Sequence, residues 1–113
     1  MSNTNRIRLV ITGATGGIGR ELLRAMNPYI DFVILNGLNL IDLRQTQNDL
    51  GLKNGVCIAG NVSNSNVRDQ IYQAAELNGG INLLINNAGM NDFDFFSNQS
   101  DEMIENLINV NLT

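Results

Sequence analysis

Thr12-Gly13-Ala14-Thr15-Gly16-Gly17-Ile18-Gly19 is the stretch of sequence that decides the fold. It follows a short run rich in β-branched residues, 6–12, and from Ile18 onward the apolar positions take the spacing of a helix. We therefore expect a strand that ends at Gly13, a glycine loop, and a helix that begins near Ile18. Backbone N–H groups at such a helix start can face a pyrophosphate.

The glycines of this loop have separate physical roles. Gly13 permits the tight turn, Gly17 lets the backbone approach a phosphate without a Cβ in the way, and Gly19 lets the helix pack closely on the strand. Glycine clusters also serve as plain strand-to-helix turns. The loop alone is therefore weak evidence of a dinucleotide site.

The alternation of strand and helix continues along the chain. Apolar runs at 32–35, 56–59 and 81–85 predict three further strands, and the segments between them have helical spacing. Strands that are apolar throughout and separated by helices indicate a parallel sheet covered on both faces. The next helix is marked by Leu40, Ile41, Leu43 and Leu50. The following helix is expected to face inward with Val67, Ile71 and Ala74, and the last helix, after a cap at Ser100, with Ile104, Leu107 and Ile108.

Length and composition indicate one folded domain over residues 1–113, with 43% hydrophobic residues and a net charge of -4. An acidic chain has no basic stripe to neutralise phosphates, which argues against nucleic acid or an anionic membrane as partner. The polar start, Met1 to Arg8, precedes no apolar run long enough for a signal peptide or a membrane span. We predict a cytoplasmic protein.

The single cysteine and the absence of histidine narrow the chemistry. Cys57 lies between Val56 and Ile58, so we expect a packed small side chain and not a nucleophile. A chain without histidine cannot form a His-based triad or a His-containing zinc site. We predict no metal site.

Two further motifs identify a family. Asn86-Asn87-Ala88-Gly89 follows the fourth predicted strand, and Asn109-Val110-Asn111-Leu112 lies in the last predicted helix. Together with the glycine loop, the chain strongly resembles the N-terminal half of the short-chain dehydrogenase/reductase family over essentially all 113 residues. The resemblance implies the first half of a Rossmann-like, doubly wound α/β fold with a parallel sheet in the order 3-2-1-4.

The resemblance also implies a site for NAD or NADP, in an oxidoreductase that moves hydride between this cofactor and a carbonyl or alcohol. Asn111 resembles the active-site asparagine, whose backbone carbonyl holds a water in a proton relay, and Asn86 would tie the fourth strand to its neighbours. An asparagine at a strand end also commonly bonds local backbone only. The implied cofactor-binding residues are Gly13, Thr15, Gly17, Ile18, Gly19, Leu38, Asn61, Val62, Asn87, Ala88 and Gly89.

Three departures from the family pattern stand out. Asn61 replaces the usual aspartate after the third strand, and Leu38 replaces the arginine of NADP-using members. Gly37 offers no carboxylate for the ribose of NAD, so the sequence selects neither cofactor. The catalytic Tyr-x-x-x-Lys is not found, because Lys53 is the only lysine and no tyrosine stands four residues before it.

We therefore expect the cofactor-binding half of an enzyme, truncated at its C-terminus and inactive alone. A non-catalytic dinucleotide sensor and a purely structural assembly module remain alternatives. The apolar edge at 82–85 and the last helix predict a homo-oligomer.

Overall fold

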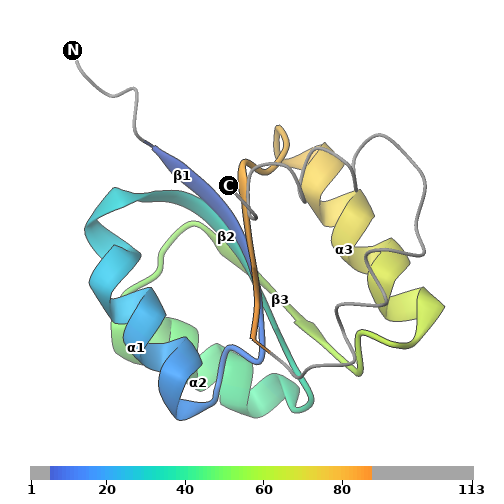
Figure 1. Ribbon diagram of the computed structural model, residues 1–113, viewed down its shortest axis with the longest axis horizontal. Helices are drawn as coiled ribbons and strands as arrows, with labels where there is room; N and C mark the ends of the chain where they lie inside the picture. Colours follow the sequence, from blue (N-terminus) through green and yellow to red (C-terminus); the bar gives the residue numbers. More distant parts are fainter. Residues whose placement is uncertain (1–5, 88–113) are drawn as a thin grey trace.

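The computed structural model describes residues 6–87, which form a parallel four-stranded sheet with helices on both faces (Figure 1). The strand order is β3-β2-β1-β4, which confirms the predicted order. The strands are β1 (Ile7–Thr12), β2 (Ile30–Gly37), β3 (Gly55–Ala59) and β4 (Leu83–Asn86). The helices are α1 (Gly17–Met26), the 3-10 turn η2 (Asn27–Tyr29), α2 (Leu40–Leu50) and α3 (Ser65–Leu77).

The register brings the carboxyl ends of the strands to one edge of the sheet. Thr12 of β1 lies opposite Asn86 of β4, and Gly37 of β2 lies opposite Ala59 of β3. The glycine loop leaves β1 at this same edge. Residues that are far apart in the chain therefore meet there, as ligand-binding residues do in open α/β sheets.

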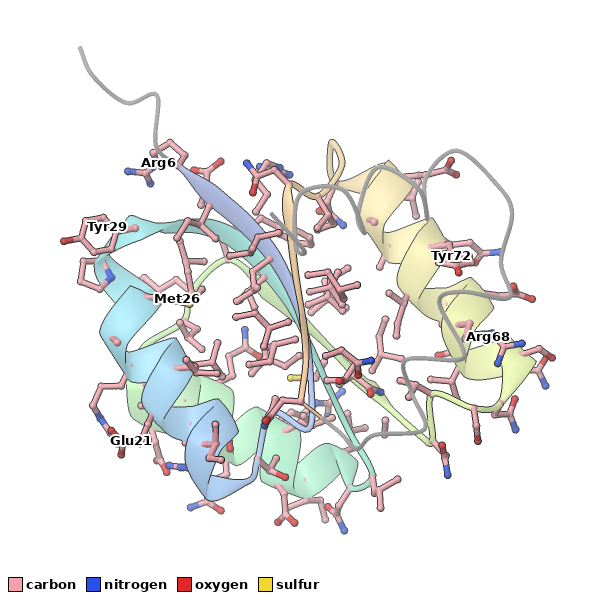
Figure 2. The ribbon with its side chains drawn as sticks, viewed as in Figure 1. Arg6, Glu21, Met26, Tyr29, Arg68 and Tyr72 are labelled. Carbon is pink, nitrogen blue, oxygen red and sulfur yellow. The ribbon has the colours of Figure 1, made fainter. Side chains whose placement is uncertain are left out.

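Two apolar cores lie on the two faces of the sheet. The helices α1 and α2 cover one face and α3 covers the other (Figure 1), and Figure 2 shows side chains filling the space beneath both layers. Leu23 of α1 and Leu43 of α2 pack against Leu9, Ile11 and other strand residues of one core. The second core holds Val10, Phe32, Ile34, Ile58, Val62, Val67, Ile71, Ala75 and Leu84.

The ends of the helices follow local side-chain chemistry. Asn39 begins α2 by accepting a hydrogen bond from the backbone N–H of Asp42 at 3.1 Å, and Gly51 ends it with a φ of 66°. Asn64 begins α3 by accepting a hydrogen bond from the N–H of Asn66 at 2.8 Å. Pro28 lies in η2 directly after α1, where its missing N–H keeps the α-helix from continuing.

The inner faces of α2 and α3 follow the helical period. On α2, Ile41 is 74% exposed, because a position two residues before the buried Leu43 lies on the opposite side of the helix. On α3, Val67 and Ile71 are buried and Ala74 packs against the same core, which confirms the predicted inward face, and Ala75 is buried beside them. Within residues 6–87, no helix is long and apolar enough to cross a membrane. The helix predicted after Ser100 lies outside the described residues.

Candidate functional site

The glycine loop makes a tight turn between β1 and α1. Gly13 has a φ of 64°, a left-handed conformation that favours glycine. The N–H of Ala14 donates to the carbonyl of Asn36 at the end of β2 at 2.9 Å, and the N–H of Gly16 donates back to Gly13 at 3.3 Å. The loop is thereby fixed to the neighbouring strand before the helix begins.

Gly17 and Gly19 differ in what surrounds them. A Cβ on Gly19 would lie 2.4 Å from the carbonyl oxygen of Gly13, so only glycine allows α1 to pack this closely on the turn. A Cβ on Gly17 would meet nothing within 4 Å. The structure thus gives Gly19 a packing role, and it leaves open space beside Gly17.

The start of α1 is open to an anion. Its first residue follows Gly16, which provides no side-chain cap, and the first turn holds no acidic residue. The N–H groups of a first helical turn have no partner within the helix, and the helix dipole places partial positive charge there. These residues therefore fit a pyrophosphate, which would take N–H hydrogen bonds at this end of the helix.

Asn86 and Asn87 connect the end of β4 to the loop. Thr12 Oγ1 donates to Asn86 Oδ1 at 2.9 Å, which ties β4 to β1 as predicted for Asn86. The N–H of Asn87 donates to Thr12 Oγ1 at 2.9 Å, and Asn87 Nδ2 donates to the carbonyl of Gly13 at 3.2 Å. Asn87 therefore braces the glycine loop. Ala88, Gly89 and Asn111 lie outside the described residues.

Asn36 is a buried polar residue that the sequence analysis missed. It is 1% exposed, and its Nδ2 donates to the carbonyls of Ile58 at 2.8 Å and Gly60 at 3.1 Å. The N–H of Gly60 donates in turn to Gly37 at 2.8 Å. This network holds the turn after β3 against the end of β2. The sequence signal that could have identified Asn36 is a single amide residue at the end of an otherwise apolar strand.

The other predicted contact residues fall into two groups. Ile18 and Leu38 are 69% and 77% exposed, so their side chains are available to a ligand. Val62 is buried in the core beneath α3, so its side chain is not available to a ligand. Asn61 Oδ1 accepts from the N–H of Ser63 at 2.9 Å and from its hydroxyl at 2.8 Å. An adenine amino group would compete with these two donors.

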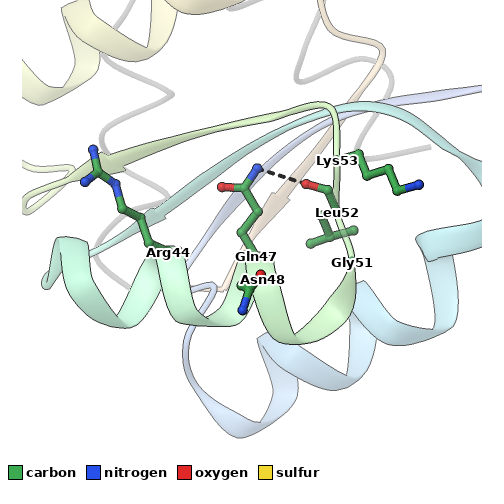
Figure 3. Close-up of a pocket in the computed structure, with 6 residues that line it drawn as sticks. All are labelled: Arg44, Gln47, Asn48, Gly51, Leu52 and Lys53. Atoms are coloured by element: carbon green, nitrogen blue, oxygen red, sulfur yellow. Dashed lines mark hydrogen bonds between the residues drawn. The ribbon is translucent and has the colours of Figure 1, made fainter.

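Thr15 lines a polar cavity of about 300 Å³ between the glycine loop and α2. The other lining residues are Arg20, Asp42, Gln45, Thr46 and Asp49. A second cavity, of about 380 Å³, lies at the C-terminal end of α2, where Gln47 Nε2 donates to the carbonyl of Leu52 at 2.9 Å (Figure 3). Arg44 and Lys53 line this second cavity at the negative end of the α2 dipole.

Cys57 is a packed side chain and not an activated nucleophile. Its Sγ donates to Gln47 Oε1 at 3.2 Å, and burial raises the pKa of the thiol against a smaller, opposing effect of Arg44. Residues 6–87 hold no cluster of side chains suited to a metal ion.

Comparison with known proteins agrees with this geometry. The family model described as short chain dehydrogenase matches residues 8–113. D-beta-hydroxybutyrate dehydrogenase of Rhizobium meliloti is 31% identical over 109 residues, which are 92% of this chain and 42% of that protein. The chain spans less than half the length of the curated relatives that it matches.

Two solved structures show the same arrangement of strands and helices. A 3-oxoacyl-[acyl-carrier protein] reductase from Brucella melitensis with bound NAD is 29% identical, with a TM-score of 0.58 over 80% of this chain and 37% of that one. YwfH, an NADPH dependent reductase involved in bacilysin biosynthesis, is 27% identical, with a TM-score of 0.59 over 72% of this chain and 34% of its own.

Proposed function

The chain belongs to the short-chain dehydrogenase family, and from this premise we propose that residues 1–113 bind NAD or NADP as the cofactor-binding half of an oxidoreductase. The observation that carries the proposal is the glycine loop, in which Gly19 brings α1 against the turn and Gly17 leaves open space at an uncapped helix start. The whole protein would transfer hydride between the cofactor and a carbonyl or alcohol.

The proposed binding mode uses this chain's backbone more than its side chains. Gly17, Ile18 and Gly19 would direct N–H groups at the pyrophosphate, with Thr15 and Leu38 beside the adenosine. Asn87 would act through the loop that it braces, and Ala88, Gly89 and the Asn61-Val62 backbone would complete the wall around the ribose and adenine. When bound, the nicotinamide ring supplies or accepts the hydride.

Calorimetric titration of NAD and of NADP tests this proposal. We expect saturable binding to the unchanged chain and none to Gly17→Trp, whose indole would fill the space over the helix start. Gln73→Trp, an equally bulky change at an exposed position of α3, is the matched control and should bind normally. Equal binding by all three proteins would refute the proposal.

We also propose that these 113 residues alone do not turn over substrate. The proton that accompanies hydride transfer needs an acid or base of suitable pKa at the reacting atom. The only lysine, Lys53, is exposed in the connection that enters β3, so it lies at the opposite end of that strand from the carboxyl edge. No tyrosine precedes it by four residues. Asn111 would contribute only a backbone carbonyl to a relay. Sustained NADH oxidation absent from Gly17→Trp would contradict this.

A dinucleotide sensor without catalysis is the second candidate, and the same open helix start favours it. Both candidates bind the cofactor, so they differ in what binding causes. A sensor would change its assembly or its partner on binding, whereas half an enzyme would only become more stable. Light scattering with and without saturating NAD separates the two.

Assembly and location are the remaining parts of the proposal. Among the described residues, β4 is the end strand of the sheet, with Leu83 and Ile85 only partly buried, which supports a homo-oligomer through this edge. A well-folded monomer at micromolar concentration in light scattering would contradict it. The cytoplasmic location stays a prediction of the sequence, as does the absence of nucleic-acid and membrane partners.

A further inference from the structure

The polar cavity of about 300 Å³ adjoins the proposed adenosine site. Thr15 contributes to it from the glycine loop, and Asp42 does so from the first turn of α2. Thr15 Oγ1 lies 3.7 Å from the point that a Cβ on Gly37 would occupy, so this lining residue is adjacent to the end of β2. In a dinucleotide held at the loop, the ribose of the adenosine faces this strand end.

Arg20 is the cation of this cavity, and other residues already hold it. Its guanidinium donates to Thr46 Oγ1 at 2.7 Å and to Asp49 Oδ2 at 3.2 Å. Thr46 is fully buried, which gives the contact a fixed position on α2. The Arg20 guanidinium is therefore held against α2, and the Asp49 carboxylate balances its positive charge.

Asp42 is the carboxylate of the cavity that no cation balances. Among the described residues it forms no salt bridge, whereas Arg20 and Asp49 form one together. The lining thus carries one positive and two negative side chains. The neighbouring Leu38 is exposed and adds no charge. A 2′-phosphate at this place would meet net negative charge, while a 2′-hydroxyl would meet acceptors.

We propose that Asp42 is a specificity-determining residue that makes the site select the dinucleotide without a 2′-phosphate, NAD, over NADP. Asp49 is the positioning residue, because it acts by keeping Arg20 on α2. This inference rests on the proposed cofactor site and adds its selectivity. It depends on the cavity and not on the strand-end positions 37 and 38, where the sequence selects neither cofactor.

The test is the dissociation constant of NAD and of NADP, measured by calorimetry with the full chain. We expect the unchanged protein to bind NAD about tenfold more tightly, since a carboxylate near a phosphate repels it through partly screened solvent. Asp42→Asn should strengthen NADP binding relative to NAD binding by roughly fivefold. Asp49→Asn should also strengthen NADP binding, and Arg20→Gln added to it should abolish that gain.

Two controls separate charge from structure. Asp69→Asn removes an exposed carboxylate of α3, on the opposite face of the sheet, and should change neither constant. Raising the salt concentration should shrink the preference of the unchanged protein, because screening weakens repulsion. This salt measurement needs no variant, so it tests the inference even if a substitution prevents folding.

The outcomes distinguish this inference from the proposed function. Equal affinity for NAD and NADP, a salt-independent preference, or parallel losses for both cofactors in Asp42→Asn would overturn the role of Asp42 and leave the cofactor site standing. Failure of the unchanged, folded chain to bind either cofactor would overturn both.

Discussion

The edge of the sheet where the strands begin, the amino edge, differs from the carboxyl edge in how its polar groups are used. At the amino edge, Arg8 donates to Asp31 Oδ2 at 2.9 Å, to the carbonyl of Gly80 at 2.8 Å and to the carbonyl of Asn78. Its guanidinium also lies 5.3 Å from the centre of the Phe32 ring. Asn82 pairs with the backbone of β1 beside it. At the carboxyl edge, the start of α1 has no side-chain cap and Asp42 has no salt bridge among the described residues.

The difference separates residues that hold the fold from residues that serve a ligand. At the amino edge, Arg8 and Asn82 form their hydrogen bonds within the chain, and such groups cost stability when one partner is removed. The carboxyl edge leaves N–H groups directed at solvent, where a ligand can use them.

Arg8→Met should be the most destabilising change, and it should leave the cofactor site intact. It removes a charged donor from Asp31 and from two backbone carbonyls while keeping much of the aliphatic stem. Hydrogen bonds to charged groups contribute about 1.5–3 kcal/mol, so we expect a loss near the upper end of that range in urea unfolding. NAD affinity of the folded fraction should not change, and a matching loss of affinity would contradict the separation of the two edges.

Gly19→Ala and Gly17→Ala form a matched pair within the carboxyl edge. The methyl group at position 19 would clash with the carbonyl of Gly13, which should lower the free energy of unfolding by about 1–3 kcal/mol. The methyl group at position 17 meets open space, so Gly17→Ala should be as stable as the unchanged chain. Thermal unfolding measures both, and equal destabilisation by the two changes would show that the turn is packed differently.

Asn87→Ala should have a smaller effect that reaches the site through the loop. It removes the donor to the carbonyl of Gly13 but keeps the backbone bond to Thr12. We expect a loss of about 0.5–1.5 kcal/mol in unfolding and a weaker affinity for NAD. Asn82→Ala, at the amino edge, is the control that should lower stability without changing that affinity.

Leu38→Arg should produce the smallest change, a shift in affinity towards NADP with unchanged stability. Leu38 is well exposed, and a solvent-exposed ion pair contributes only about 0.2–1 kcal/mol. The expected gain for NADP is therefore a few-fold in titration calorimetry. If the unmutated chain already bound one cofactor about a hundredfold more tightly than the other, Leu38 would not be the residue beside the 2′ position of the adenosine ribose.

Much of the fold was predictable because it depends on local patterns. Apolar runs and glycines located the four strands and the turn at Gly13, and the parallel order follows from the βαβ connections. The inner face of α2 was less predictable, because Ile41 and Leu43 are both apolar, whereas the structure buries Leu43 and Thr46 and leaves Ile41 exposed.

The residues of the site were predictable only where a single local motif contains them. The spacing of the glycines predicted the packing of Gly19. The contacts of Arg8, Asn36 and the Arg20–Asp49 pair join segments more than twenty residues apart, and no local pattern reports which polar side chains will meet. Asp42 was unremarked for the same reason, because its importance depends on the cavity that two helices and the loop form together.

Hydrogen–deuterium exchange with and without NAD tests the central claim most directly, because it reports both edges in one measurement. We predict that saturating NAD slows exchange of the backbone N–H groups of residues 13–19 and leaves residues 78–82 at the amino edge unchanged. Exchange that is unaltered at the glycine loop, or slowed instead at the amino edge, would contradict a dinucleotide site at the carboxyl edge of this sheet.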